Sequence, residues 1–480
     1  MNADVVFPQN ATVPMERRIF VNRHLHMANI SAIGFDMDYT IARYRRQAVE
    51  RLAYDITINK LIQRGYPEEI RKIPYDPHFV IRGLIVDKQL GNIIKLDRHR
   101  EVCRGFHGST KLKTNDIRNH YFKKKTLWEA TRFTRVDTLF SLPEVCLYAK
   151  LIDYSDAHAE FKKSYSDLFE DTRSCIDEAH ADDSLKSIVS SNLETYLERD
   201  LQLPETLHRL RCAGKKLFLL TNSLLPYTEK VMTYLLNSFH AEYPSWRDYF
   251  DIVMVGAQKP SFFSHLEPFV EIDDNNQNLG NIVRVLERGH LYQGGNFTDL
   301  EATLGIHGEQ ILYVGDHIYG DILRTKKAGF WRTALVVEEL EDDIRHTLTH
   351  APVLSELETL AKERRYLATL AGWQTEEANQ QIPGSSAQIH TQIAAEETRQ
   401  QVKRLDEQMH RLGEVIDRTY NNRWGMIFKD KGHTTRFGEQ VSNFACVYTG
   451  RVSNFGFYDP QHEYWTPPDL MPHEQDIRGW

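Results

Sequence analysis

Two aspartates, Asp36 and Asp38, follow a short apolar run in the segment Phe-Asp-Met-Asp-Tyr-Thr at residues 35–40. Two carboxylates two residues apart at the end of a strand suit phosphoryl transfer through a covalent aspartyl intermediate. Asp36 would attack phosphorus, and Asp38 would protonate the leaving alkoxide and then deprotonate the hydrolytic water. Taken alone the motif is short, and a turn or a helix N-cap explains it equally well.

Three further polar segments could act on the same phosphate. Thr221, Asn222 and Ser223 offer a hydroxyl and backbone N–H groups to phosphate oxygens, although such a triplet is usually a helix cap. Lys259 offers an ammonium that would neutralise charge developing during transfer, although a lone lysine is usually solvated. The segment Gly-Asp-His-Ile-Tyr-Gly-Asp at 315–321 offers acidic oxygens that suit Mg²⁺, although it could simply form turns.

Each of these four segments follows a short apolar run that predicts a buried parallel strand. The runs are Ala32–Phe35, Leu217–Leu220, Ile252–Val255 and Ile311–Val314. We expect one intervening helix at 227–236 and the start of another at 282–286. The alternation predicts an α/β fold with a doubly wound parallel sheet, in which functional groups gather at the strand C-termini. The four motifs are therefore expected to form one site.

More than 170 residues separate the first two predicted strands, which exceeds one crossover helix and predicts an inserted cap. We expect a catalytic core from residues 1–45 and 205–345, and an insertion from 46–204. The insertion should contain a β-hairpin at about 79–96 and a mainly helical cap at about 125–204.

Residues 346–480 are expected to form a C-terminal helical extension that packs on the core. One apolar face is marked by Val402, Leu405, Met409, Leu412 and Ile416. An intersubunit coiled coil is the disfavoured alternative, because only about three heptads are present.

Composition narrows the class of protein. The chain has 480 residues, of which 41% are hydrophobic and 26% charged, and its net charge is -8, so it predicts a globular protein that does not bind a nucleic acid polymer. The five cysteines are widely spaced and contain no CxxC pair, which disfavours a disulfide framework or structural zinc site and favours a reducing cytoplasm. No signal peptide or membrane span is expected.

The order of the four strand-end motifs resembles the haloacid dehalogenase superfamily from Ile30 to about Leu335. The resemblance implies that Asp36 and Asp316 bind Mg²⁺ through their side chains and Asp38 through its backbone carbonyl, with Asp321 supporting these ligands. Dehalogenases and P-type ATPases of the superfamily lack a carboxylate at the position of Asp38. The resemblance therefore implies a phosphatase or a phosphotransferase.

Further segments resemble the cytosolic purine 5'-nucleotidase II family. These segments are 18–23, 34–40, 82–84, 138–140, 315–323 and 471–474. The family hydrolyses 6-oxopurine nucleoside monophosphates, chiefly IMP and GMP, and can transfer the phosphate to another nucleoside. The resemblance implies a purine nucleoside monophosphate as substrate, a cytoplasmic location and a homotetramer.

A predicted cap helix carries residues that suit a purine base. Arg173, Asp177 and His180 are spaced to share one helix face, and Lys186 lies just beyond. A cation beside a carboxylate matches the O6 acceptor and N1 donor of a 6-oxopurine, an edge that adenine reverses. An exposed Arg173–Asp177 salt bridge is the simpler interpretation without the resemblance. The resemblance implies base-binding roles for all four residues and for Phe140, which would otherwise be assigned to the core.

The resemblance also implies activation by a purine nucleotide effector at a separate site that includes Tyr319. Asp137 replaces an asparagine that is usual in the family, so the effector is not identified. The basic segment 111–125 could bind effector phosphates, or it could be a solvated face. Two alternatives to the nucleotidase are a haloacid dehalogenase-type phosphatase for another phosphomonoester and a non-catalytic nucleotide sensor.

Overall fold

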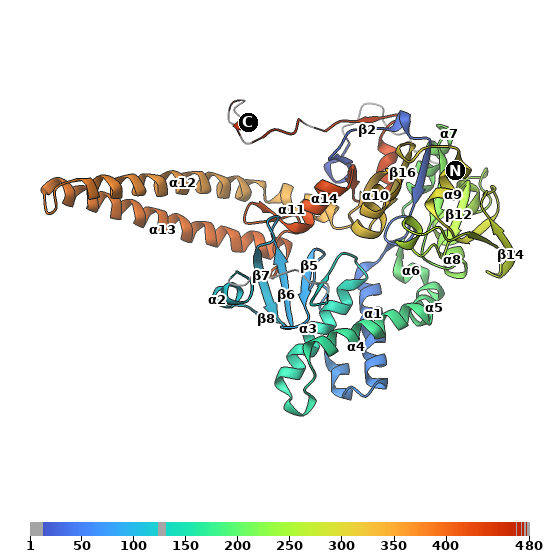
Figure 1. Ribbon diagram of the computed structural model, residues 1–480, viewed down its shortest axis with the longest axis horizontal. Helices are drawn as coiled ribbons and strands as arrows, with labels where there is room; N and C mark the ends of the chain where they lie inside the picture. The colour runs from blue at the N-terminus through green and yellow to red at the C-terminus, as the bar shows by residue number, and fades with distance from the viewer. Residues whose placement is uncertain (1–12, 123–130, 467, 472, 475–476, 478–480) are drawn as a thin grey trace. The chain divides into compact units, whose positions relative to one another are not determined.

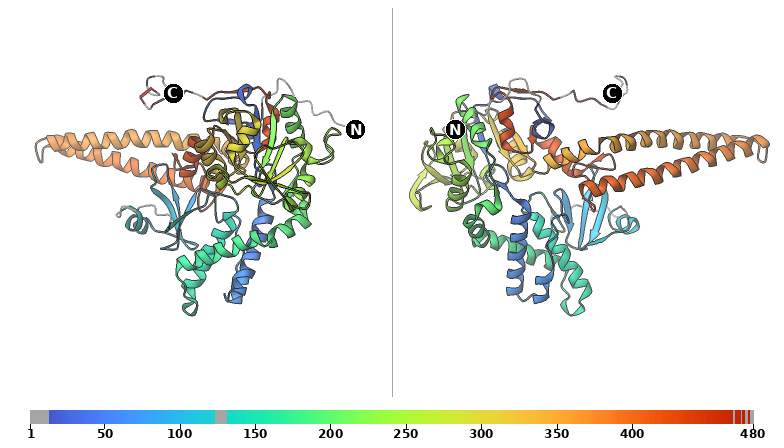
Figure 2. Two further views of the ribbon diagram at one scale, coloured as in Figure 1. Left: turned by 45° about the vertical axis from the view of Figure 1, so that its right-hand side comes forward. Right: turned by 180° about the vertical axis from the view of Figure 1, so that it is seen from behind.

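The computed structural model describes residues 13–122, 131–466, 468–471, 473–474 and 477 (Figures 1 and 2). The chain divides into two compact units, one formed by Met1–Glu341 with Thr435–Trp480 and the other by Asp342–Thr434. Among the described helices, none has the length and apolar composition needed to cross a membrane. All five cysteines are free thiols, as their spacing predicts.

A mixed sheet forms the centre of the first unit. Its strand order is β1-β20-β17-β16-β3-β11-β12-β15-β13-β14. The run from β20 to β15 is parallel, whereas β1, β13 and β14 pair antiparallel at its two ends. The parallel strands are β20 (Val447–Thr449), β17 (Arg332–Val336), β16 (Ile311–Gly315), β3 (Ala32–Phe35), β11 (Lys216–Leu220), β12 (Ile252–Val255) and β15 (Leu291–Gly294). The predicted parallel α/β fold is confirmed.

The four strands that precede the motifs are neighbours in this sheet, with β3 between β16 and β11, and β12 beyond β11. Gly34 in β3 lies under the ring of Phe218, where a Cβ atom would come within 2.1 Å of the ring. The helix expected at 227–236 is α8 (Leu225–Leu236).

The prediction that a helix begins at 282–286 was wrong. Ile282 lies in β14 (Asn278–Val283), which forms a hairpin with β13 (Phe269–Ile272). A short apolar run suits either a helix or a strand, and here the antiparallel partner decides.

The inserted cap has a β part and a helical part. The expected hairpin is formed by β5 (Leu84–Asp87) and β6 (Asn92–Leu96), and it belongs to a larger antiparallel sheet of order β8-β7-β6-β5-β9. The other strands of this sheet are β7 (Val102–His107), β8 (Thr110–Lys111) and β9 (Phe133–Arg135). The helices α1 (Arg46–Gln63), α3 (Ser141–Ala157), α4 (Tyr165–Ala181) and α5 (Ser184–Ser191) make up most of the rest. Residues 123–130, at the start of the predicted helical part, lie outside the described residues.

A short two-stranded ribbon connects the cap to the core. β4 (Arg43–Tyr44) leads into the cap and pairs antiparallel with β10 (Leu197–Glu198), which leads out of it. The register places Tyr44 opposite Leu197. We refer to this pair of strands as the hinge ribbon.

The second unit contains a long helical hairpin. Helices α12 (Ala351–Gln380) and α13 (Ser386–Tyr420) run antiparallel, and Arg364 and Asp406 form an ion pair between them at 2.9 Å (Figure 1). The turn ends at Ser385, whose hydroxyl accepts a hydrogen bond from the backbone of Gln388 and caps α13. The apolar face predicted on α13 is accordingly paired with a helix of the same unit.

The C-terminal residues differ from the expected helical extension. After the helical hairpin the chain returns to the first unit, where α14 (Arg436–Phe444) precedes β20. β20 pairs with β17 on one side and with β1 (Phe20–Val21) on the other. A three-residue strand carries too short a pattern to be recognised, because its place is set by distant partners.

Candidate functional site

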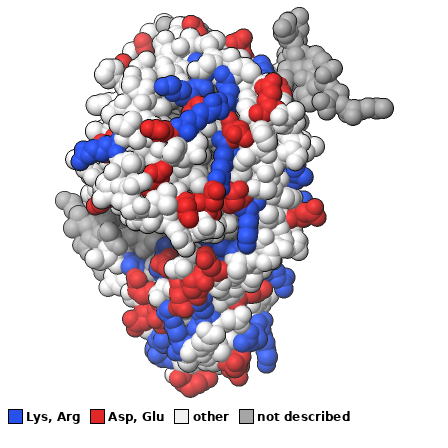
Figure 3. Space-filling view, turned by 90° about the vertical axis from the view of Figure 1, so that its right-hand side faces the viewer, with Lys and Arg blue, Asp and Glu red and all other residues white. Residues whose placement is uncertain are grey.

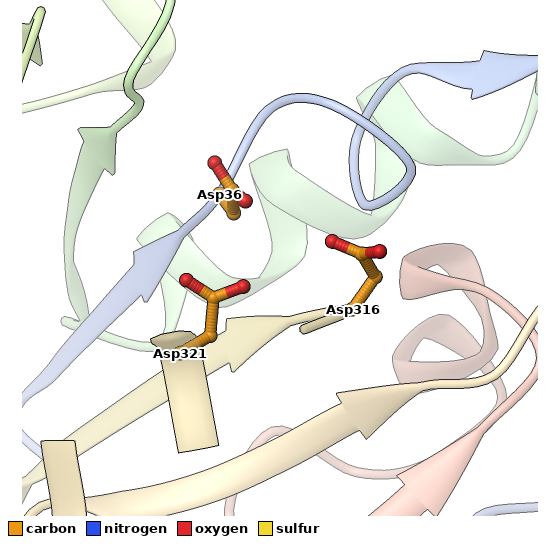
Figure 4. Close-up of side chains that lie close together, drawn as sticks. All are labelled: Asp36, Asp316 and Asp321. Carbon is orange, nitrogen blue, oxygen red and sulfur yellow. The ribbon is translucent and has the colours of Figure 1, made fainter. Parts of the chain in front are cut away.

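Three aspartates converge at the C-terminal edge of the parallel sheet. Asp36 directly follows β3, Asp316 directly follows β16, and Asp321 lies in the π-helical turn Ile318–Leu323. Because β3 and β16 are parallel neighbours, their ends bring the first two carboxylates together. One oxygen from each of the three lies within 4.8 Å of the others, and Figure 4 shows the carboxylates pointing toward one another.

Burial makes this cluster electrostatically unfavourable without a counter-charge. It raises the pKa of Asp36 to about 7, and repulsion from Asp321 and Asp38 adds to the shift. Burial also raises the pKa of Asp316 well above its usual value, with further contributions from Asp321 and Asp36. Clustered carboxylate oxygens are the ligands that Mg²⁺ prefers, so these side chains fit that ion.

Lys259 supplies one positive charge to the cluster. Its Nζ lies 2.8 Å from Oδ1 of Asp36 and 2.9 Å from Oδ1 of Asp321, and it donates to the Tyr313 hydroxyl at 2.9 Å. Burial opposes the ammonium charge, but Asp321 and Asp36 outweigh it and raise the pKa of Lys259 well above its usual value. The other carboxylate oxygen of Asp321 accepts from the backbone of His317 at 3.1 Å. Both oxygens of Asp321 are thus engaged, which suits a supporting role.

Each residue of the Thr221–Ser223 segment forms hydrogen bonds near the cluster. The Thr221 hydroxyl is buried and accepts the Ser223 N–H at 3.1 Å. The Asn222 amide clamps the backbone of Lys259, accepting its N–H at 2.6 Å and donating to its carbonyl at 2.9 Å. The Ser223 hydroxyl donates to Oδ2 of Asp38 at 2.7 Å. The direct phosphate contacts predicted for these residues stay predictions.

Asp38 also contacts a residue that the motifs did not indicate. The Tyr44 hydroxyl donates to Oδ1 of Asp38 at 2.5 Å and lies 2.8 Å from the Tyr227 hydroxyl. Tyr44 belongs to the hinge ribbon and Tyr227 to α8. A tyrosine near a motif carries no recognisable spacing, so sequence reasoning could not separate these two from core residues.

Three of the predicted base-binding residues lie around this carboxylate. The rings of Phe140 and His180 are 5.3 Å apart in an edge-to-face contact, and Phe140 also contacts Tyr39 at 4.7 Å. Burial lowers the pKa of His180, with a further contribution from Lys186. The Lys186 ammonium lies 5.4 Å from the ring centroid of Tyr227. Cap and core residues thus meet beside Asp38.

The other two predicted base-binding residues are arranged differently. Nε of Arg173 forms an ion pair with Oε1 of Glu144 in α3 at 2.8 Å, and the Glu144 side chain is only 1% exposed. Asp177 is exposed on the same helix. Burial raises the pKa of Glu144 to about 7, partly offset by Arg173. Arg173 is therefore engaged within the cap, and its partner is neither Asp177 nor an open pocket.

One predicted effector residue, Tyr319, lies in the turn Ile318–Leu323 that also carries Asp321, and the other is Asp137. Tyr319 accepts a hydrogen bond from Gln440 at 2.6 Å, and the Arg135 guanidinium lies 4.8 Å from its ring centroid. Burial raises the pKa of Asp137 to about 6 against the opposing charges of Arg135, Arg436 and Arg82. Residues 123–125 of the basic segment lie outside the described residues.

Arg82 connects this region to the edge of the sheet where the three aspartates converge. Its guanidinium is buried, donates to the backbone carbonyl of Asp316 at 3.2 Å and pairs with the Glu339 carboxylate. The sequence around Arg82 indicated only a family resemblance and gave no signal for this contact. On the face drawn in Figure 3, acidic and basic side chains are intermixed.

Comparisons with known proteins agree with these motifs. A model of the 5' nucleotidase family matches residues 19–476. A 5'-nucleotidase domain-containing protein from Dictyostelium discoideum is 29% identical over 466 residues, which cover 95% of this chain and 74% of that protein. The 5'-nucleotidase domain-containing protein 2 of Rattus norvegicus is 27% identical over 488 residues, which cover 99% of this chain and 83% of that protein.

Two solved structures show looser similarity. A predicted phosphoglycolate phosphatase from Haemophilus somnus 129pt is 15% identical with a TM-score of 0.27, and the match covers 65% of this chain and 87% of that one. CbbY from Rhodobacter sphaeroides in complex with phosphate is 12% identical with a TM-score of 0.24, and the match covers 64% of this chain and 86% of that one.

Proposed function

Because the chain belongs to the 5' nucleotidase family, we propose that it is a Mg²⁺-dependent 5'-nucleotidase that hydrolyses the 6-oxopurine nucleoside monophosphates IMP and GMP. The observation that supports the chemistry is the convergence of Asp36, Asp38 and Lys259 at one edge of the sheet. The cap residues beside Asp38 support a substrate that is larger than phosphate.

The proposed mechanism gives each of these residues a role. Asp36 attacks phosphorus to form an aspartyl phosphate, while Asp38 gives its proton to the leaving alkoxide. Asp38 then takes a proton from the water that hydrolyses the intermediate. Lys259 lies against Asp36 and would neutralise the charge that develops on the phosphoryl oxygens.

The metal-binding residues would be the side chains of Asp36 and Asp316 with the backbone carbonyl of Asp38. A bound Mg²⁺ would offset the repulsion between the buried carboxylates and polarise the phosphoryl group. Asp321 would hold Lys259 and the His317 backbone beside these ligands.

The base would contact Phe140, His180 and Lys186 in this proposal. Phe140 offers an aromatic face, and Lys186 offers donors for the O6 acceptor of the base. Arg173 and Asp177 would recognise the base edge only if Arg173 left Glu144. We therefore propose that the base is recognised mainly by Phe140, His180 and Lys186.

The test is phosphate release from IMP, GMP, AMP and CMP, with Mg²⁺ and with EDTA, by the wild-type protein and by Asp36→Asn. We expect kcat/KM to favour IMP and GMP by at least about tenfold, the ratio given by about 1.4 kcal/mol of discrimination. EDTA and Asp36→Asn should each abolish release. Equal rates on all four nucleotides would refute the base specificity but leave the phosphatase assignment in place.

A second candidate is a phosphatase for another phosphomonoester, favoured by the Arg173–Glu144 ion pair, which keeps one predicted base-binding residue occupied. Turnover of sugar phosphates without turnover of nucleotides would select it. Nucleotide binding without release of phosphate from any substrate would select a nucleotide sensor.

Three further properties belong to the proposal. An aspartyl phosphate could be captured by the hydroxyl of a second nucleoside, which would appear as a labelled nucleotide when a labelled nucleoside is added. A purine nucleotide effector would bind near Tyr319 and Asp137 and raise kcat/KM. A cytoplasmic homotetramer is the assembly that we propose, and light scattering would measure its mass.

A further inference from the structure

The carboxylate of Asp38 is held by a hydroxyl group on each oxygen. Tyr44 donates to Oδ1 at 2.5 Å, and Ser223 donates to Oδ2 at 2.7 Å. The Tyr44 hydroxyl also lies 2.8 Å from that of Tyr227. Both tyrosines are buried, with exposures of 5% and 8%. A carboxylate with a donor on each oxygen is fixed in one rotamer.

The direction of these hydrogen bonds follows from the number of protons. A phenol hydroxyl carries one proton, and Tyr44 uses that proton to donate a hydrogen bond to Asp38. Tyr227 must therefore be the donor in the contact between the two phenols. Burial raises the pKa of both phenols, so both keep their protons at neutral pH. The chain of donors runs from Tyr227 through Tyr44 to Asp38, and such chains strengthen each member.

The two tyrosines join three parts of the first unit. Tyr44 lies in the hinge ribbon, opposite Leu197 of the strand that leaves the cap. Tyr227 lies in α8 of the core and is covered by Lys186 from α5 of the cap. The hydroxyl chain thus connects Asp38 to the place where the cap joins the core.

We propose that Tyr44 and Tyr227 are positioning residues that hold Asp38 in the orientation from which it protonates the leaving oxygen. The inference rests on the acid role that the proposed function gives to Asp38. It is independent of which nucleotide or other phosphate ester is the substrate.

The step affected is cleavage of the ester bond. Asp36 forms a bond to phosphorus as the bond from phosphorus to the ester oxygen breaks, and the proton of the Asp38 carboxyl moves to that oxygen. Asp38 is left as a carboxylate that accepts from Tyr44 and Ser223. Water then attacks phosphorus and gives a proton to Asp38, so that phosphate leaves, Asp36 is regenerated and Asp38 is again an acid.

The experiment compares two kinds of leaving group. An alkyl phosphate such as IMP or glycerol 2-phosphate needs a proton on the departing oxygen, whereas p-nitrophenyl phosphate leaves as a stable phenolate. We expect Tyr44→Phe to lower kcat/KM on the alkyl ester by about 10- to 100-fold, within the usual contribution of a general acid. On p-nitrophenyl phosphate, kcat/KM should stay within about twofold of the wild-type value, because kcat/KM reports the steps up to departure of the leaving group and not the later hydrolysis, in which Asp38 acts on both esters.

Tyr227→Phe provides a second, milder variant. Tyr44 keeps its bond to Asp38 in this variant but loses its own donor, so we expect a loss on the alkyl ester of only about two- to tenfold. Because the two phenols form one chain, the double variant should lose no more than Tyr44→Phe alone.

Tyr249→Phe is the matched control. Tyr249 is fully buried, and its hydroxyl has no hydrogen-bond partner among the described residues. This variant should keep the wild-type rates on both esters. Thermal melts of all variants identify any loss of folding.

Two results would overturn the inference. One is an equal loss on the alkyl and aryl esters by folded Tyr44→Phe, which would indicate a general structural role. The other is a wild-type rate of Tyr44→Phe on the alkyl ester. Should IMP not be hydrolysed while glycerol 2-phosphate is, the substrate proposal fails and the same comparison still tests the hydroxyl chain. A wild-type protein inactive on every ester would overturn both proposals.

Discussion

At the scale of single residues, the site is a balance of buried charges. Three carboxylates lie within reach of one another, and Lys259 is the cation that contacts two of them. Bringing these groups together costs free energy, because like charges repel and each loses its hydration. The raised pKa of Asp36, about 7, expresses that cost.

The first prediction concerns the stability of the metal-free protein against pH. The pKa of Asp36 is raised from 3.8 to about 7 on folding, mainly by burial, so the folded protein holds a proton that the unfolded chain releases. This contribution to the free energy of unfolding is complete below pH about 4 and is lost as the pH rises through about 7. Urea unfolding in EDTA should show the decline from pH about 5 to about 7.5.

Asp36→Asn is the matched control, because asparagine does not titrate. We expect the variant to lose part of the pH dependence of the free energy of unfolding. In the wild-type protein, Mg²⁺ should reduce the same pH dependence by stabilising the ionised carboxylate. Identical pH dependence in the wild-type and variant proteins would contradict the assignment of the raised pKa to Asp36.

At the scale of elements, the parallel strands position the chemistry. Neighbouring parallel strands end at one edge, so β3 and β16 deliver Asp36 and Asp316 to the same place. Gly315, the last residue of β16, lies in close contact with Asp321, since a Cβ atom on Gly315 would lie 2.6 Å from Oδ2 of Asp321. The end of β16 therefore needs a residue without a side chain.

The second prediction concerns α4 of the cap. Arg173→Gln removes the partner of the buried Glu144, and we expect the free energy of unfolding to fall by about 1 to 3 kcal/mol, reduced from the full cost because Arg173 is partly exposed. Asp177→Asn is the control on the same helix, and it should change the free energy of unfolding by less than about 0.5 kcal/mol. Urea denaturation measures both.

The same two variants distinguish a structural from a base-binding role. If Arg173 acts mainly within the cap, Arg173→Gln should leave the ratio of GMP to AMP turnover unchanged within about threefold while stability falls. A collapse of that ratio in both variants, without loss of stability, would instead support recognition of the base edge by Arg173 and Asp177.

At the scale of the whole molecule, the residues of the proposed site all belong to one of the two compact units. Every residue assigned to the catalytic edge or to the cap lies in the unit formed by Met1–Glu341 and Thr435–Trp480. The unit Asp342–Thr434 is dominated by the hairpin of α12 and α13. The helical hairpin can therefore be shortened without removing any residue of the proposed site.

The third prediction shortens the hairpin. Replacing residues 368–402 by a short Gly-Ser turn keeps the Arg364–Asp406 ion pair between the remaining parts of the two helices. We expect kcat/KM to stay within about twofold of the wild-type value, because no assigned site residue is removed. A loss of more than about tenfold in a protein whose first unit remains folded would show that the hairpin contributes to catalysis.

Much of the catalytic edge was predictable because its signals are local. A strand of four buried residues followed by Asp36 and Asp38 carries both its structure and its chemistry in one segment. The five-stranded cap sheet beyond the expected hairpin was less accessible, because strands such as β9 (Phe133–Arg135) are short and pair with distant residues. The partner of Arg173 was likewise out of reach, since Glu144 lies in another helix.

The amino-acid sequence alone determined the parallel α/β core, the four motifs at its strand ends and the family to which the chain belongs. Each of these depends on short segments, and within each segment the informative residues are close together along the chain. Only the tertiary structure decided that β20 joins the core sheet, that Arg173 pairs with Glu144, and that Tyr227 reaches Asp38 through Tyr44. These contacts link residues far apart in the chain, and chain folding alone brings such residues within hydrogen-bonding distance.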